Sequence, residues 1–319
     1  MKKYKETEKG FYGCYWPCEG KNSEIAIMAM LGDDCEDHVA KSGVRWFHKK
    51  FGVNVLTLSP AHKDYSHHNL PVERIGAAIE YLKGKGNTKF GIAGASTTGM
   101  YSLIAASYYP EITLTIAMTP SDFVMEGFYR GKRDGMEEWP GDGESTASWQ
   151  GEPLPYLPFV YRHPEYYQKM KADAKKSKDM IVSRGVFDDS EKAHPVREEE
   201  FIKVERIKGK LLLIGAEDDV LWDTAKYIRR MEERLSKFPH ECDAESMVYE
   251  HATHFVFPES LLKEMMPVGG SLFVGLFKAG RDYKKECREA RIDIDRRVSL
   301  AIQNWISEGT PDRRDISGS

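Results

Sequence analysis

The chain of 319 residues carries 46 lysines and arginines against 50 aspartates and glutamates, which gives a formal net charge of −4. With 41% apolar and 30% charged residues, it can bury a sizeable core beneath a mixed, solvated surface, so a disordered or collagen-like chain is excluded. A nearly neutral chain without a basic stripe is a poor candidate for binding nucleic acid, and no apolar run approaches the roughly 18 residues of a membrane-spanning helix.

Short β-rich segments alternate with helical patterns along much of the chain. Apolar residues recur every three or four positions in His38–Phe51 and in Pro71–Lys83, where Pro71 fits the first turn of a helix. Near-continuous apolar strands between amphipathic helices predict an α/β fold, with a mostly parallel sheet covered by helices on both faces. The predicted strands are Glu24–Leu31, Val53–Ser59, Thr88–Gly94, Ile112–Met118, Lys210–Ala216 and Glu245–Glu250.

The alternation stops between residues 120 and 204, where aromatic residues are dense. A structureless loop of this length is uncommon in a compact domain, so we predict an inserted lid with short helices of its own. The chain then divides into a first part of the core (1–119), the lid (120–204) and a second part of the core (205–319) that ends in helices. The lid aromatics could pack the insertion onto the body or line a site. They are Phe123, Phe128, Tyr129, Trp139, Trp149, Tyr156, Phe159, Tyr161, Tyr166 and Tyr167.

A serine stands between an apolar strand and a helical run in the segment FGIAGASTTGM, residues 90–100. This strand–turn–helix context is typical of a nucleophile held on a strained elbow, which needs small residues two positions before and after the serine. Gly94 provides the first small residue for Ser96, but Thr98 occupies the second position and glycine follows only at Gly99. The alternative is an ordinary turn in which Ser96 caps the next helix.

Two further polar residues follow predicted strands downstream. Asp219 and His254 complete the order serine, acid, histidine that α/β-hydrolases use. In that arrangement, His254 would take the proton of Ser96, and the acid would fix the histidine tautomer and stabilise its charged form. Asp218 and His251 are the alternatives for the acid and the base. We favour Asp219 for the V-L-W stretch that follows it, and His254 for its His-x-x-x-Pro run.

The oxyanion donors expected for this arrangement are backbone N–H groups of Thr97, Gly32 and Asp33. The loop at residues 31–37 reads LGDDCED, and its four carboxylates would oppose a developing negative charge. Either only the loop backbone faces the site, with Asp33 or Asp34 capping the next helix, or the oxyanion hole is weakened.

The cysteines give no pattern of metal ligands. Their odd number and scattered spacing favour reduced thiols, and we expect no metal and no cofactor. The basic start MKKYKETEKG has no apolar segment behind it, so we expect no secretory signal and a cytoplasmic protein. The five cysteines are Cys14, Cys18, Cys35, Cys242 and Cys287.

Three motifs, GASTTG, VERIKGKLLLIGAEDDVLW and HATHFVFP, together resemble the C-terminal catalytic domain of the acyl-CoA thioester hydrolase and bile acid-CoA:amino acid N-acyltransferase family, a relative of the dienelactone hydrolases. The similarity covers about 70–120 and 200–265. It implies an α/β-hydrolase fold with a triad of Ser96, Asp219 and His254. Members that transfer an acyl group to an amino acid typically use cysteine as the nucleophile, so the resemblance with serine implies hydrolysis.

The chain departs from the family pattern in three ways. Thr98 stands where the family has glycine, the residues before the first predicted strand leave no room for the N-terminal β-sandwich of animal members, and the lid is longer and more aromatic. The expected function is a serine hydrolase of ester or thioester bonds, most specifically an acyl-CoA thioesterase. Arg130, Lys132 and Arg133 are candidates for binding the CoA phosphates. The alternatives are a carboxylesterase or dienelactone-hydrolase-like enzyme acting on small molecules, and a hydrolase-fold binding protein without turnover.

Overall fold

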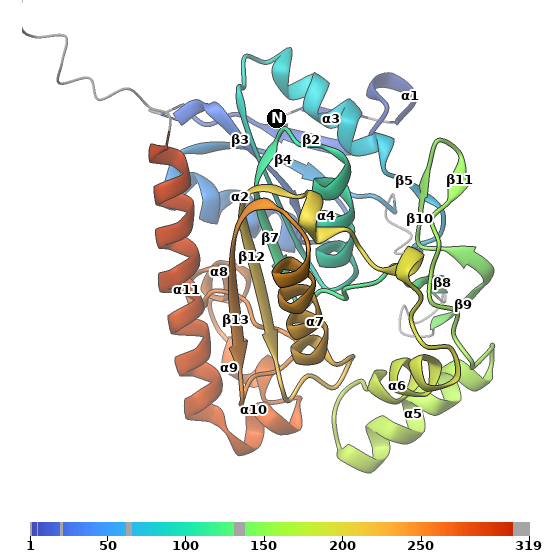
Figure 1. Ribbon diagram of the computed structural model, residues 1–319. Helices are drawn as coiled ribbons and strands as arrows, with labels where there is room; N and C mark the ends of the chain where they lie inside the picture. The colour runs from blue at the N-terminus through green and yellow to red at the C-terminus, as the bar shows by residue number, and fades with distance from the viewer. Residues whose placement is uncertain (1, 5, 20–21, 62–65, 131–137, 309–319) are drawn as a thin grey trace, which may run out of the picture.

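A central eight-stranded sheet organises the molecule. The computed structural model describes residues 2–4, 6–19, 22–61, 66–130 and 138–308 (Figure 1). The strand order in the sheet is β1-β2-β4-β3-β6-β7-β12-β13. The bounds are β1 (Lys2–Tyr4), β2 (Gly13–Trp16), β3 (Asn22–Met30), β4 (Val53–Leu58), β6 (Lys89–Ala95), β7 (Ile112–Met118), β12 (Lys208–Ala216) and β13 (Glu241–Tyr249).

The six strands from β4 to β13 run parallel, and all six coincide with predicted strands. All six residues of β4 are buried, as expected for a strand covered on both faces. The sequence did not predict β1 and β2, which extend one edge in antiparallel pairing. They are three and four residues long, too short to give a periodic pattern. The prediction of a mostly parallel α/β sheet is confirmed.

Helices cover both faces of the sheet (Figure 1). Side chains alternate along the strands, so Met28 of β3 packs on one face and Ile27 on the other. The first face is covered by α3 (Glu73–Lys83), α4 (Thr97–Tyr108) and α7 (Thr224–Lys237). The second face is covered by α2 (His38–Phe51), α8 (Glu259–Met265) and α11 (Lys284–Ser307). The shorter helices are α1 (Glu6–Lys9), α9 (Gly270–Val274) and α10 (Lys278–Asp282).

The ends of two predicted helices show how local chemistry sets their bounds. Helix α2 has the predicted range, and the Asp37 side chain caps it by accepting a hydrogen bond from the Ala40 N–H. The expectation that Asp33 or Asp34 caps this helix is therefore wrong. Pro71 does not lie in the first turn of α3 either, because it belongs to β5 (Leu70–Pro71).

The inserted segment contains strands as well as the predicted helices. Its helices are α5 (Glu165–Ser177) and α6 (Arg184–Ala193), followed by two 3-10 turns, η1 (Glu198–Glu200) and η2 (Val204–Arg206). Its strands are β8 (Glu126–Arg130), β9 (Glu138–Ser145), β10 (Ala147–Trp149) and β11 (Glu152–Pro153). The sequence reading missed them because they pair outside the central sheet and carry glycine and proline instead of an apolar run. Strand β10 pairs with β5, which joins the insertion to the body.

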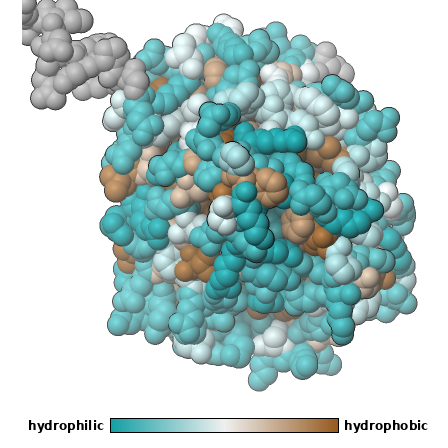
Figure 2. Space-filling model, in the orientation of Figure 1, coloured by the Kyte–Doolittle hydropathy of each residue, from teal (hydrophilic) through white to brown (hydrophobic). Residues whose placement is uncertain are grey.

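The face of the molecule in Figure 2 is mostly hydrophilic, with small and separate apolar areas. In the part of the chain that the structure describes, no helix is both long and apolar enough to cross a membrane.

Helix α11 gives a direct test of the packing on the second face. Trp305 is 2% exposed, and its indole Nε1 donates a hydrogen bond to Thr113 Oγ1 at 2.9 Å. We expect W305A to lower the free energy of unfolding by about 3–5 kcal/mol, since it leaves a large cavity. L300A on the same helix should change it by less than about 0.5 kcal/mol, because a substitution at an exposed position costs little. Urea denaturation followed by circular dichroism measures both, and equal losses would contradict the packing described.

Candidate active site

Ser96 has a strained backbone at the junction of β6 and α4. Its φ of 60° and ψ of −128° are unfavourable for any residue with a side chain. A Cβ atom at Gly94 would lie 2.2 Å from the Thr98 carbonyl oxygen, and one at Gly99 would lie 2.8 Å from the Met118 carbonyl oxygen. Both glycines are therefore required by the close approach of the backbone. The turn is the strained elbow that the sequence predicts.

Thr98 is accommodated at the position where the family pattern has glycine. Its Oγ1 lies 2.6 Å from the Met30 carbonyl oxygen of β3 and 2.8 Å from that of Ala95, and it accepts a hydrogen bond from the Ala95 N–H. The hydroxyl thus ties the elbow to the neighbouring strand. The Ser96 side chain makes no capping hydrogen bond, so its hydroxyl does not serve the helix in the way that the alternative interpretation expected.

The four candidate acids and bases form two separate pairs. His254 Nδ1 lies 2.8 Å and 3.0 Å from the two carboxylate oxygens of Asp219, and both residues are buried. His251 Nδ1 lies 2.9 Å from Asp218 Oδ2, and its ring stacks on Tyr283 at 3.6 Å between centroids. The Asp218 and His251 side chains are 37% and 25% exposed. These two alternative residues therefore form a second pair that is partly exposed to solvent.

Thr119 connects the buried pair to the elbow. Its Oγ1 lies 3.5 Å from His254 Nε2, and its carbonyl oxygen accepts a hydrogen bond from the indole of Trp222. The preceding residue, Met118, accepts a hydrogen bond from the Ser96 N–H at 2.8 Å. Ser96 and His254 therefore lie on either side of the end of β7. Among the described residues, no hydrogen bond joins Ser96 Oγ to His254.

Ser96 lines a small cavity of about 60 Å³, and five of its twelve lining residues are aromatic. An edge-to-face series of rings leads from His254 to Trp222 (4.8 Å between centroids), then to Phe187 (5.2 Å) and Phe159 (5.2 Å). The full lining consists of Ser96, Thr97, Met125, Phe128, Glu138, Phe159, Tyr166, Ile181, Ser183, Phe187, Leu221 and Trp222.

The aromatic residues of the inserted segment have the two kinds of contact that the sequence left open. Phe128, Phe159 and Tyr166 line the Ser96 cavity. In contrast, Trp149 packs against Tyr108 at 4.6 Å between ring centroids and fastens the insertion to α4.

The predicted oxyanion residues lie at two places beside the elbow. Thr97 is the first residue of α4, where N–H groups lack helical partners, and it lines the cavity. Gly32 and Asp33 belong to the loop after β3 and are not part of the cavity lining. A Cβ atom at Gly32 would lie 2.3 Å from the Asp37 carboxylate, so glycine leaves room for the residue that caps α2. One of the four loop carboxylates is thus turned toward the backbone of its own loop.

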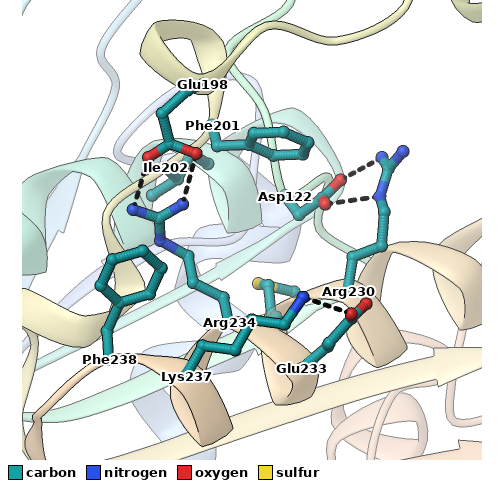
Figure 3. A pocket seen from close by; sticks show the side chains of 10 residues that line it. Asp122, Glu198, Phe201, Ile202, Arg230, Glu233, Arg234, Lys237 and Phe238 are labelled. Carbon is teal, nitrogen blue, oxygen red and sulfur yellow. Dashed lines mark hydrogen bonds and ion pairs between the residues drawn. The ribbon is translucent and has the colours of Figure 1, made fainter.

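A larger hollow of about 320 Å³ lies against α7 (Figure 3). Its charged side chains are paired with one another: Asp122 with Arg230, Glu198 with Arg234, and Glu233 with Lys237 (Figure 3). The hollow contains none of the predicted catalytic residues. It is a junction where ion pairs hold the inserted segment to α7, and the candidate active site is the smaller cavity beside Ser96.

Sequence reasoning did not single out Thr119, and only its place after a predicted strand could have drawn attention to it. Lys132 and Arg133, two candidates for binding phosphate, lie outside the described residues, and only the backbone of Arg130 is described. In the described ranges, no group of three His, Cys, Asp or Glu side chains is arranged to hold a metal ion.

The parallel sheet, the elbow and the helices on both faces define an α/β-hydrolase. Residues 70–261 match the family described as BAAT / acyl-CoA thioester hydrolase C terminal, and this match covers more than half of the chain. The chain therefore belongs to that family, which confirms the resemblance seen in its motifs. Family membership supports an enzyme that acts on ester or thioester bonds.

Solved structures with a similar fold are distant in sequence. The Pyrococcus furiosus esterase Pf2001 is 15% identical over 96% of this chain and 97% of its own, with a TM-score of 0.47. Est1E from Butyrivibrio proteoclasticus, solved with ferulic acid bound, is 14% identical over 88% of this chain and 97% of its own, with a TM-score of 0.40. No curated protein matches the chain.

The outer pair gives a prediction about pH. The hydrogen bond that the His251 ring donates to the Asp218 carboxylate raises the pKa of His251 above its ordinary value of 6.5, because the carboxylate favours the charged ring. The pair therefore adds stability below pH 6.5, and this contribution is lost as the pH rises through the raised pKa. NMR titration of the histidine ring protons should show the raised pKa, and D218N should return it towards 6.5. D219N is the control, and a pKa of His251 that falls in D219N but not in D218N would contradict the pairing.

Proposed function

We propose that the protein is a serine hydrolase in which Ser96 attacks the acyl carbon of an ester or thioester. His254 is the general base and Asp219 is its acidic partner. The observation that carries this proposal is the strained backbone of Ser96 at the rim of a cavity, beside a buried histidine–aspartate pair. Strain at a residue between two regular elements is typical of functional sites, because the surrounding fold must hold it in place.

The proposed reaction proceeds in two steps. Ser96 Oγ bonds to the acyl carbon while His254 Nε2 accepts the hydroxyl proton, and the tetrahedral intermediate collapses when the histidine returns that proton to the departing alcohol or thiol. Water then attacks the acyl-enzyme, with His254 again taking and returning a proton. Asp219 holds the proton on Nδ1, which leaves Nε2 as the acceptor, and stabilises the imidazolium that forms.

The proposed oxyanion donors are backbone groups. The N–H of Thr97 at the start of α4 adds the partial positive charge of a helix N-terminus. Gly32 or Asp33 would supply a second N–H from the loop after β3. The capping of α2 by Asp37 supports this assignment, since it turns one carboxylate of the loop away from the reacting carbonyl.

The substrate proposed from the family is a small-molecule acyl thioester, most specifically an acyl-CoA, and the protein would act in the cytoplasm. The segment 120–204 would be the lid over the core formed by residues 1–119 and 205–319. The small volume of the cavity favours a second candidate, a carboxylesterase or dienelactone-hydrolase-like enzyme for small substrates, since pockets for drug-sized ligands are typically about 300–1,000 Å³.

The choice of catalytic residues is testable by substitution. We expect wild type to be labelled by a fluorophosphonate probe and S96A to remain unlabelled. H254A should lower kcat by about a thousandfold or more, because removal of a triad member disables the unit, whereas H251A should remain within a few-fold of wild type. H251A is the matched control because its ring also pairs with an aspartate. A folded wild type that cannot be labelled would favour the binding protein, and the reverse order of the histidine variants would assign the base to His251.

The leaving group requires a separate measurement. We expect release of CoA from short acyl-CoAs with a higher kcat/KM than release of p-nitrophenol from esters of the same acids. Thiol release and phenolate absorbance measure the two rates, and S96A corrects for background hydrolysis. Faster cleavage of the esters, without release of CoA from the thioesters, would contradict the proposed thioesterase and favour the carboxylesterase.

A further inference from the structure

The cavity beside Ser96 is small compared with the pockets that bind drug-sized ligands. Its volume is about 60 Å³, and aromatic side chains from α5, α6 and the neighbouring lid segments form much of its wall. A long alkyl chain would have to displace these rings, whose edge-to-face contacts continue to His254. The enclosed space therefore fits a short acyl group.

Tyr166 brings a polar group to this apolar wall. The residue lies in the first turn of α5, is 2% exposed, and packs against Phe159 at 5.4 Å between ring centroids. Its hydroxyl makes no hydrogen bond within the part of the chain that the structure describes. The hydroxyl oxygen is not one of the fully enclosed polar atoms that lack a partner, so it is open to the cavity. A tyrosine hydroxyl on an otherwise apolar wall usually finds a hydrogen-bond partner. An unpaired hydroxyl at a substrate cavity is available to a ligand.

The charges near Tyr166 determine which ligand groups can bind beside its hydroxyl. Burial, with a further contribution from Glu138 and Glu126, raises the pKa of Tyr166 well above 10, so the hydroxyl keeps its proton and acts as a donor. Glu138 places a carboxylate in the cavity lining, which disfavours an anionic group on the ligand, whereas the Glu126 carboxylate is already paired with Arg162. Ser183 also lines the cavity, but its hydroxyl is already donated to the Leu221 carbonyl oxygen. A neutral oxygen acceptor, such as a hydroxyl or keto oxygen, suits the site best.

We infer that Tyr166 selects a short acyl group that carries a neutral hydroxyl or keto oxygen, and that it donates a hydrogen bond to that oxygen. This inference rests on the function proposed for Ser96 and specifies its substrate class. An unsubstituted acyl group of the same length would leave the tyrosine hydroxyl buried without a partner. A site built to bond a substrate hydroxyl discriminates strongly against the analogue that lacks it, for this reason.

Matched pairs of esters test the inference. In the first pair, the p-nitrophenyl ester of 3-hydroxybutyrate is compared with that of butyrate. In the second pair, the p-nitrophenyl ester of 4-hydroxybenzoate is compared with that of benzoate. The two pairs place the additional oxygen at two distances from the reacting carbon. We expect wild type to favour the hydroxylated member of at least one pair by about tenfold in kcat/KM, as one additional hydrogen bond allows. Y166F should bring that ratio close to one. The ratio is measured within each variant, so it does not depend on the fraction of folded enzyme.

Y161F is the control, because Tyr161 also belongs to the lid but bonds Asp189 and does not line the cavity. It should keep the wild-type ratio. Ratios near one in wild type, or a preference that Y166F retains, would overturn the inference. Faster cleavage of p-nitrophenyl octanoate than of p-nitrophenyl butyrate would contradict the inferred selection of a short acyl group. These results are distinct from failure of the proposed function, in which S96A would hydrolyse all four esters as fast as wild type.

Discussion

The strained turn at Ser96 is the constraint on which the candidate site depends. A residue with a side chain at φ 60° costs of the order of 1–3 kcal/mol, and only a rigid surrounding holds it there. Strand β6 provides that rigidity because it lies between β3 and β7 in the middle of the sheet. The absence of a side chain at Gly94 allows the Thr98 carbonyl to close over the turn, and the Thr98 hydroxyl bonds β3. The threonine thus contributes a hydrogen bond at a position where glycine would contribute only space.

The parallel topology explains why residues far apart in the sequence meet at one edge. The carboxyl ends of parallel strands lie on the same side of a sheet, and β6, β7 and β12 are neighbours. Ser96, Thr119 and Asp219 follow these three strands directly or after a short turn, and His254 follows β13. The two histidine–aspartate pairs differ in their exposure to solvent. Only the inner pair is shielded from water, so its electrostatic interaction is stronger than that of the exposed pair.

Much of this arrangement could be predicted from the sequence, because its signals are local. The six parallel strands are apolar runs, and α2 shows both its periodicity and its stop signal, Gly52, with φ at 64°. The strands of the insertion were missed because they are short or carry glycine, proline and charged residues instead of an apolar run. The choice between the two acids was harder, because Asp218 and Asp219 are adjacent and only the fold determines which side chain points inward. Thr119 and Tyr166 matter through contacts with residues distant in the chain, which no local pattern reports.

The inserted segment links the size of the cavity to the stability of the fold. Arg230 of α7 bonds both Asp122 and Glu191 of α6, and Arg234 bonds Glu198 beyond α6. These ion pairs hold the segment that carries the cavity wall against a helix packed on the central sheet. An outward movement of α6 would separate Arg230 from Glu191, and separating a half-buried charge pair leaves both groups incompletely solvated. These ion pairs therefore oppose an outward movement of α6, which carries Phe187 of the cavity wall.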